Sequence, residues 1–140
     1  HLAGWLHDRI GVPRERIVQI YNGVDTQKFS PAPAGRIDIG DRNFSSPDAL
    51  VIGTAGRMAV VTNPMGLLRA FLYLAAANRD NRQPLRLVMI GDGVLREDLQ
   101  QALEVANVED LVWMPGERDD IARILKGIDV FVLPSLNEGI

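Results

Sequence analysis

The residues of this chain that could do chemistry gather in three short loops, each directly after an apolar run. The first loop ends in Gly56-Arg57, the second is Gly91-Asp92-Gly93, and the third, 134–139, contains Glu138. Glycines let the backbone approach a ligand closely, and arginine offers a planar, permanently charged fork that suits phosphate. Parallel strands would bring the loops to one edge of a sheet, where ligands of such folds bind. The pattern predicts a site for a phosphate-bearing ligand.

Each loop also has a purely structural interpretation. Gly91 and Gly93 could form only a tight turn between a strand and a helix. Arg57 could form a surface salt bridge, and Glu138 could cap a helix or interact with its first turn. The residues alone leave these alternatives open.

The composition excludes several classes of protein. With 46% hydrophobic and 24% charged residues among 140, the chain resembles an ordinary globular domain rather than a disordered or fibrous protein. The net charge is −3 and the basic residues are scattered, which argues against nucleic-acid binding. The absence of cysteine excludes disulfides, and two isolated histidines argue against a zinc site. No apolar stretch approaches the roughly 20 residues that span a bilayer. The lack of cysteine is typical of a cytoplasmic protein, which we expect here.

Four apolar runs predict strands that are buried on both faces, and helical patterns lie between them. The predicted strands are 50–54, 85–90, 111–114 and 130–133. The first helix begins at Asn63-Pro64, with Asn63 as its cap, and the second extends over 95–106. The third follows Asp119 or Asp120 as a cap. This alternation predicts an α/β fold, a Rossmann-like doubly wound parallel sheet.

The first 48 residues are less regular. Residues 2–10 have helical spacing, 17–20 form a short β-rich run, and Asp25 is the predicted cap of a single helical turn. From Ser30 to Asp48, prolines and glycines break any period, which predicts a linker or an excursion on the surface.

Several short motifs occur in an order and spacing that resemble one enzyme family. They are Ile20-Tyr-Asn-Gly-Val-Asp25, Gly56-Arg57-Met58, Val88-Met-Ile-Gly-Asp-Gly93, Pro115-Gly116 and Pro134-Ser-Leu-Asn-Glu-Gly-Ile140. Each motif is weak alone, but the ordered set resembles the group 1 family of retaining glycosyltransferases with the GT-B fold. Within that family the chain looks most like bacterial sugar transferases of exopolysaccharide assembly.

The resemblance implies a two-domain enzyme that transfers a sugar from a nucleotide diphosphate to a sugar or lipid-linked glycan acceptor. It implies retention of the anomeric configuration and no bound metal or other cofactor. Residues 1–24 would be the end of the acceptor domain and the crossover, and residues 25–140 an incomplete donor domain. The missing acceptor domain could hold the enzyme at the inner face of the membrane. We expect a fragment that transfers no sugar alone and leaves one sheet edge uncovered.

The resemblance also implies roles for individual residues. Arg57 would bind the donor pyrophosphate and Glu138 would lie near the donor sugar, so both are the expected catalytic residues. Thr62 stands where the family has a lysine that assists this arginine. A second family carboxylate, which holds the ribose, would lie beyond Ile140. The other implied donor-binding residues are Gly56, Gly91, Gly93, Gly116, Glu117, Arg118, Asn137 and Gly139.

The replacement of the family lysine by Thr62 supports a second hypothesis, a Rossmann-like nucleotide-binding module without catalysis. A dinucleotide oxidoreductase fits poorly. The Gly-x-Gly-x-x-Gly fingerprint does not follow the first strand, and Gly91-Asp92-Gly93 lacks the third glycine.

Overall fold

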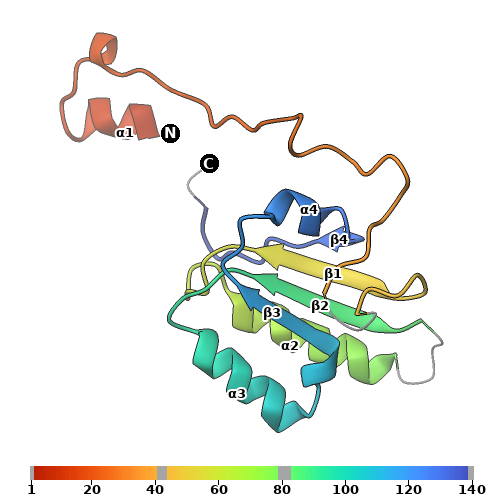
Figure 1. Ribbon diagram of the computed structural model, residues 1–140. Helices are drawn as coiled ribbons and strands as arrows, with labels where there is room; N and C mark the ends of the chain where they lie inside the picture. Colours follow the sequence, from red (N-terminus) through yellow and green to blue (C-terminus); the bar gives the residue numbers. More distant parts are fainter. Residues whose placement is uncertain (1, 41–43, 79–82, 139–140) are drawn as a thin grey trace.

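The structure is a computed structural model that describes residues 2–40, 44–78 and 83–138, in which four parallel strands form one sheet (Figure 1). The strands are β1 (Leu50–Ala55), β2 (Leu85–Ile90), β3 (Val112–Gly116) and β4 (Val130–Phe131). The helices are α1 (Leu2–Asp8), α2 (Pro64–Ala77), α3 (Arg96–Ala106) and α4 (Ile121–Leu125), with 3-10 turns η1 (Arg14–Arg16) and η2 (Glu109–Leu111). The strand order is β3-β2-β1-β4, and the predicted parallel α/β fold is confirmed.

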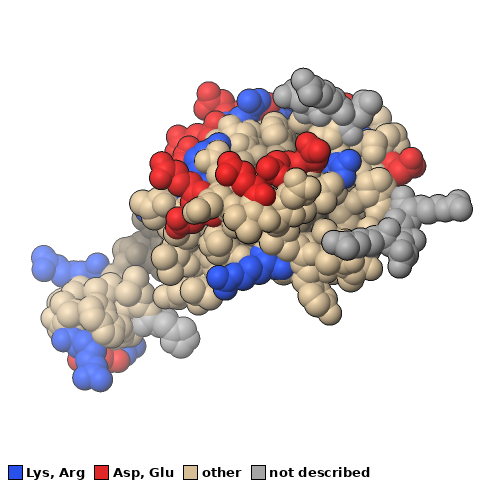
Figure 2. Space-filling view, turned by 90° about the horizontal axis from the view of Figure 1, so that it is seen from below, with Lys and Arg blue, Asp and Glu red and all other residues tan. Residues whose placement is uncertain are grey.

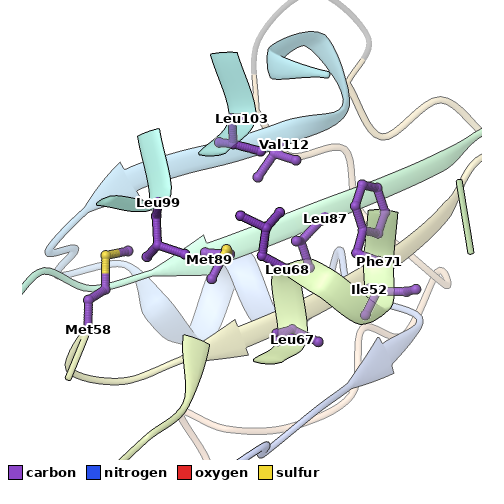
Figure 3. Packing of buried hydrophobic residues seen from close by; sticks show 10 residues of the cluster. All are labelled: Ile52, Met58, Leu67, Leu68, Phe71, Leu87, Met89, Leu99, Leu103 and Val112. Carbon is purple, nitrogen blue, oxygen red and sulfur yellow. The ribbon is translucent and has the colours of Figure 1, made fainter. Parts of the chain in front are cut away.

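Helices cover both faces of the central strands, which explains why the strand sequences do not alternate. Helices α2 and α3 lie on one face and α4 lies on the other (Figure 1). Figure 3 shows the buried cluster between the sheet and α2 and α3, which contains Ile52, Met58, Leu67, Leu68, Phe71, Leu87, Met89, Leu99, Leu103 and Val112. The cluster on the other face contains Ile39, Val51, Val88, Ile90 and Ile124. Successive residues of β1 and β2 thus enter opposite cores.

The caps of α2 and α4 lie at the predicted residues, but only the cap of α2 makes a capping hydrogen bond through its side chain. Asn63 precedes α2, and its Oδ1 accepts a hydrogen bond from the Gly66 amide over 3.2 Å, so the predicted cap is confirmed. Asp120 occupies the N-cap position of α4 but makes no capping hydrogen bond with its side chain. The predicted position of the cap is confirmed, but the Asp120 carboxylate binds Arg118 instead of the helix amides.

The two outer strands differ from their predicted forms. Strand β3 continues through Pro115 and Gly116, beyond the predicted end of the strand at residue 114. An edge strand tolerates proline because the amide on its free side has no partner strand to bond. Strand β4 has only two residues, and Val130 and Phe131 are each 46% exposed. The prediction of a longer strand buried on both faces is wrong, since β4 pairs with β1 alone among the described strands.

The segment 30–48 is more than a surface linker. Ile39 is 1% exposed and packs under α4, and the Ser45 hydroxyl accepts a hydrogen bond from the Ile39 amide over 2.7 Å. Arg36 fixes the segment to the sheet, because its guanidinium binds the Asp129 carboxylate and the carbonyl oxygens of Ala49 and Ser46. The Asp129 carboxylate also accepts a hydrogen bond from the Val51 amide of β1.

Replacing Arg36 by methionine should lower the free energy of unfolding by about 2 to 3 kcal/mol, the range for charged hydrogen bonds that are only partly open to water. Urea denaturation of the chain measures this change. Arg69→Met is the control, because Arg69 is exposed on α2 and its side chain makes no ion pair or hydrogen bond with the described residues. The control should shift stability by no more than about 0.5 kcal/mol. Equal effects of the two substitutions would show that Arg36 does not hold the segment.

The N-terminal elements α1 and η1 lie apart from the sheet and are joined to it by an extended stretch (Figure 1). The predicted β-rich run 17–20 forms no strand, and Ile20 is 87% exposed. A short β-rich sequence gains its hydrogen bonds only from a neighbouring strand, and none lies beside it in the described residues. The predicted cap at Asp25 is confirmed, because its Oδ1 accepts from the amides of Gln27 and Lys28.

The face that carries α2 and α3 shows acidic side chains gathered in one area, with Lys and Arg side chains among and around them (Figure 2). Helix α3 carries Glu97 and Asp98 in its first turn.

Among the described residues, none of the helices combines the length and the apolar character that a membrane span requires.

Candidate functional site

The strand order creates a crevice at one point of the sheet. The chain runs outward from β1 through β2 to β3, and then crosses back through α4 to place β4 on the other side of β1. Strands β1 and β4 are neighbours, so the loops that follow them meet at this reversal and are joined by hydrogen bonds. Ligands of open parallel sheets bind outside the carboxyl ends of the strands at such a reversal.

Two hollows lie at this edge. The first, the Glu138 pocket, has a volume of about 140 Å³ and is lined by Thr54, Ala55, Gly56, Arg57, Met58, Thr62, Pro64, Met89, Ile90, Leu133, Pro134, Ser135 and Glu138. The second, the Glu117 pocket, has about 450 Å³ and is lined by Ala55, Gly56, Arg57, Ile90, Gly91, Asp92, Glu117, Arg118, Asp119 and Ile121. They share four lining residues, so a ligand that fills both must pass over Gly56-Arg57.

Arg57 is exposed at the junction of the two pockets. Within the described ranges, its guanidinium forms no ion pair and no hydrogen bond. The salt-bridge alternative therefore has no partner in this part of the chain. An unpaired guanidinium that faces a hollow is available to an anionic ligand.

Thr62 lines the Glu138 pocket, but its hydroxyl is used inside its own loop. The oxygen accepts a hydrogen bond from the Ala59 amide over 3.2 Å and lies within donating distance of the carbonyl oxygens of Arg57 and Ala59. A hydroxyl donates only one hydrogen bond, so one of these carbonyls receives it. Thr62 thus closes the loop that carries Arg57 and adds no positive charge.

The structure explains why positions 91 and 93 are occupied by glycine. Their φ angles are 120° and 152°, and a Cβ atom would lie 2.2 Å from the Gly56 carbonyl oxygen or 2.5 Å from that of Met58. Both amides are also occupied, since Gly91 donates to the Gly116 carbonyl and Gly93 to the Asp92 side chain. Of these two glycines, only Gly91 lines a pocket. They let the loops after β1 and β2 pack together.

The end of β3 forms the far wall of the Glu117 pocket. Glu117 and Arg118 line it, whereas Gly116 is buried behind it with a φ of 80°. Arg118 binds Asp120 through two hydrogen bonds of 2.8 and 3.1 Å. This contact lowers the pKa of the Asp120 carboxyl and raises the pKa of Arg118. The charge of Arg118 is therefore already compensated, which leaves Arg57 as the unpaired cation of the described pocket walls.

The loop after β4 supplies the opposite wall of the Glu138 pocket. Glu138 is exposed and lines it, whereas Asn137 is exposed and lines neither pocket. Gly139 lies outside the described residues. Within the described ranges no group of His, Asp or Glu side chains is placed to hold a metal ion. The described walls of the two pockets thus carry one free cation, Arg57, and the carboxylates of Asp92, Glu117, Asp119 and Glu138.

A family model for group 1 glycosyl transferases matches residues 49–140, which is more than half of the chain. The chain belongs to the group 1 glycosyltransferase family. The resemblance noted in the sequence is thereby confirmed, and the match covers every strand of the sheet and all the residues that line the two pockets.

Two bacterial relatives illustrate the group 1 family. A UDP-Gal:alpha-D-GlcNAc-diphosphoundecaprenol alpha-1,3-galactosyltransferase of Escherichia coli is 35% identical over 126 residues, covering 89% of this chain and 32% of the relative. A D-inositol 3-phosphate glycosyltransferase of Kineococcus radiotolerans is 32% identical over 140 residues, covering 95% of this chain and 32% of the relative. The chain therefore spans about a third of the length of these relatives.

The fold is shared with solved glycosyltransferase structures. The crystal structure of Anabaena Alr3699/HepE in complex with UDP-glucose matches with a TM-score of 0.65 and 20% identity, covering 89% of this chain and 34% of that one. This group 1 chain thus has the Rossmann-like arrangement of GT-B glycosyltransferases.

Two residues that line the pockets of this group 1 chain were not predicted as part of the site, Asp119 in the Glu117 pocket and Leu133 in the Glu138 pocket. Asp92, Pro134 and Ser135 lie in the predicted loops but had been given no role. Their position in the loops after the strands was the available signal. Asn63 was recognised only as a helix cap, although its side chain also bonds the Pro134 carbonyl.

Proposed function

We propose that this chain is the donor-binding part of a retaining glycosyltransferase that uses a nucleoside diphosphate sugar and acts without a bound metal or other cofactor. The observation that carries the proposal is the meeting of two pockets at the unpaired Arg57. The nucleoside would occupy the larger Glu117 pocket, the diphosphate would cross Gly56-Arg57, and the sugar would enter the Glu138 pocket. Family membership supports the reaction class.

The chemistry asked of Arg57 is stabilisation of the leaving diphosphate. Negative charge grows on the β-phosphate oxygens as the bond to the sugar breaks, and a fixed guanidinium beside them lowers the barrier. Glu138 would hold sugar hydroxyl groups, so that the sugar carbon faces the acceptor. The loop hydroxyl of Thr62 adds no second cation, which places most of the electrostatic task on Arg57.

The acceptor lies outside the two pockets and is proposed from the relatives. The Escherichia coli galactosyltransferase is named for an acceptor linked to diphosphoundecaprenol. We therefore favour a sugar or lipid-linked glycan acceptor and a role in exopolysaccharide or other cell-surface glycan synthesis. Residues 1–24 would be the end of the acceptor domain and the crossover, and 25–140 part of the donor domain. Such an enzyme would work at the inner face of the membrane.

Calorimetric titration of the chain with UDP, GDP and ADP tests the donor site. We expect one of them to bind at least about 10-fold more tightly than the other two, a difference of about 1.4 kcal/mol. The corresponding monophosphate should bind at least about 10-fold more weakly, because it loses a charged contact to Arg57. Absence of binding by all three nucleotides would contradict the proposed function.

Replacing Glu138 by glutamine should separate sugar recognition from nucleotide binding. The amide keeps the size of the side chain but loses its charge, so kcat of the enzyme that carries this chain should fall about 10-fold to 100-fold. Affinity for the free nucleoside diphosphate should change less than about 2-fold, since Glu138 lines only the smaller pocket. Steady-state transfer assays and titrations provide the two values. An unchanged kcat would remove Glu138 from the proposed role.

One observation favours a second candidate, a nucleotide-binding module without catalysis. In the described walls of the Glu138 pocket, Arg57 is the sole Lys or Arg, and Thr62 does not replace the family lysine in charge. Both candidates predict nucleotide binding. Sugar transfer by the enzyme that carries this chain would favour the first, and its absence with intact nucleotide affinity would favour the second.

A further inference from the structure

We infer that Asn63 is a positioning residue that ties the loop carrying Arg57 to the loop carrying Glu138. This inference rests on the proposed function. The Asn63 Nδ2 atom donates a hydrogen bond of 3.2 Å to the Pro134 carbonyl oxygen, across 71 residues of chain. Arg57, Glu138 and Pro134 line the same pocket, and Asn63 lies in the chain between two further lining residues, Thr62 and Pro64.

Asparagine suits this position because its amide supplies an acceptor and a donor at once. While Nδ2 bonds the loop after β4, Oδ1 accepts from the Gly66 amide and caps α2. The backbone of Asn63 is left-handed, with φ 51° and ψ 46°, a conformation that asparagine adopts more readily than most residues. A Cβ at position 66 would lie 2.4 Å from Nδ2, so Gly66 leaves the space that this amide occupies.

A second bond strengthens the same connection. The Leu136 amide donates to the Val61 carbonyl oxygen over 2.8 Å, so the two loops are joined at two points. On the other side of Asn63, the Thr62 hydroxyl closes the loop back toward Arg57. The distance between the guanidinium and the carboxylate is therefore set by a short series of hydrogen bonds in which Asn63 is the side-chain link.

If Asn63 were only a helix cap, its side chain would stabilise α2 alone. That role and a link between the loops predict different results for two variants. Aspartate at position 63 retains the capping oxygen and lacks the Nδ2 donor, and serine retains a cap without adding charge. Aspartate has no donor for the bond to Pro134, and the serine hydroxyl is attached one bond closer to the backbone than Nδ2, so it does not reach that carbonyl. A helix-cap role would be preserved in both variants, whereas the connection between the loops would be lost.

The experiment compares wild type with Asn63→Asp and Asn63→Ser. Amide hydrogen exchange measured by NMR reports on Leu136, and the amides of α2 report on the cap. Titration with UDP and with UDP-glucose, UDP-galactose and UDP-N-acetylglucosamine gives the affinity ratio of the tightest sugar nucleotide to UDP. If GDP or ADP is the preferred nucleotide, its matched sugars replace these. The control is Asn78→Asp, because Asn78 makes a similar amide bond of 2.8 Å to the Gln83 carbonyl at the far end of α2.

We expect both Asn63 variants to speed exchange at Leu136 by about 10-fold or more, with little change in the middle of α2. The affinity for the sugar nucleotide relative to that for UDP should fall about 5-fold to 10-fold, because only the sugar contacts the displaced loop. The control should leave both values unchanged. Unchanged exchange at Leu136, or equal losses for UDP and its sugars, would overturn the inference. Failure of wild type to bind any nucleotide would instead overturn the proposed function, and the exchange measurement would still decide on the link.

Discussion

Removal of the Arg57 side chain should lower kcat/KM for sugar transfer by the enzyme that carries this chain by about 100-fold to 1,000-fold, the loss found when one fixed group that stabilises transition-state charge is deleted. The reason is the position of this guanidinium. It stands where both pockets meet and is not neutralised by a carboxylate in the described residues. Affinity of Arg57→Ala for the nucleoside diphosphate should fall about 10-fold or more, because the ground-state contact is also charged. Transfer kinetics and calorimetry measure the two effects.

Arg69→Ala is the matched control for Arg57→Ala. Arg69 is an exposed arginine of α2 that lines neither pocket. Its removal changes the net charge equally and should alter kcat/KM less than about 2-fold. Arg57→Lys should retain part of the activity, since a lysine keeps the charge but not the planar fork. Equal effects of Arg57→Ala and Arg69→Ala would mean that charge in general, and not the site, is responsible.

Gly91→Ala should lower the free energy of unfolding by about 3 kcal/mol or more. The added Cβ would lie 2.2 Å from the Gly56 carbonyl oxygen, and the φ of 120° is itself strained for alanine. Relief of this overlap requires movement of the backbone that carries Arg57, so nucleotide affinity should fall with stability. Urea denaturation and titration of the folded variant measure the two changes.

Gly23→Ala is the control for Gly91→Ala. A Cβ at Gly23 meets nothing within 4 Å and its φ is not in the left-handed region. Its effect should be within about 0.5 kcal/mol. A stability of Gly91→Ala close to that of wild type would contradict the close packing of the loops after β1 and β2.

Local patterns in the sequence identified most of the sheet. Residues 85–90 form a strand with the predicted bounds, and α2 begins at Pro64 as predicted. These predictions succeeded because each rests on a local cause, an apolar run in a sheet buried on both faces or a proline after a capping asparagine. The bounds of β4 failed because burial depends on neighbours, and the strand lies at an edge.

The grouping of the candidate site residues at one sheet edge was also predicted from local patterns. The strand ends placed Gly56, Arg57 and Glu138 at one edge, and all three line the Glu138 pocket. The partners of these residues depend on contacts between distant segments, which no local pattern contains. The bond from Asn63 to Pro134 and the burial of Ile39 are of this kind.

The measurement that tests the central claim most directly is the NMR titration of the labelled chain with its preferred nucleoside diphosphate, followed through the backbone amides. A donor that crosses from one pocket to the other should shift amides of residues 55–58 and 117–119, which line the described walls on both sides of the crossing. Addition of the matching sugar nucleotide should extend the shifts to residues 135–138. Shifts confined to another surface, such as the hollow beside Arg36, would contradict the proposed donor site.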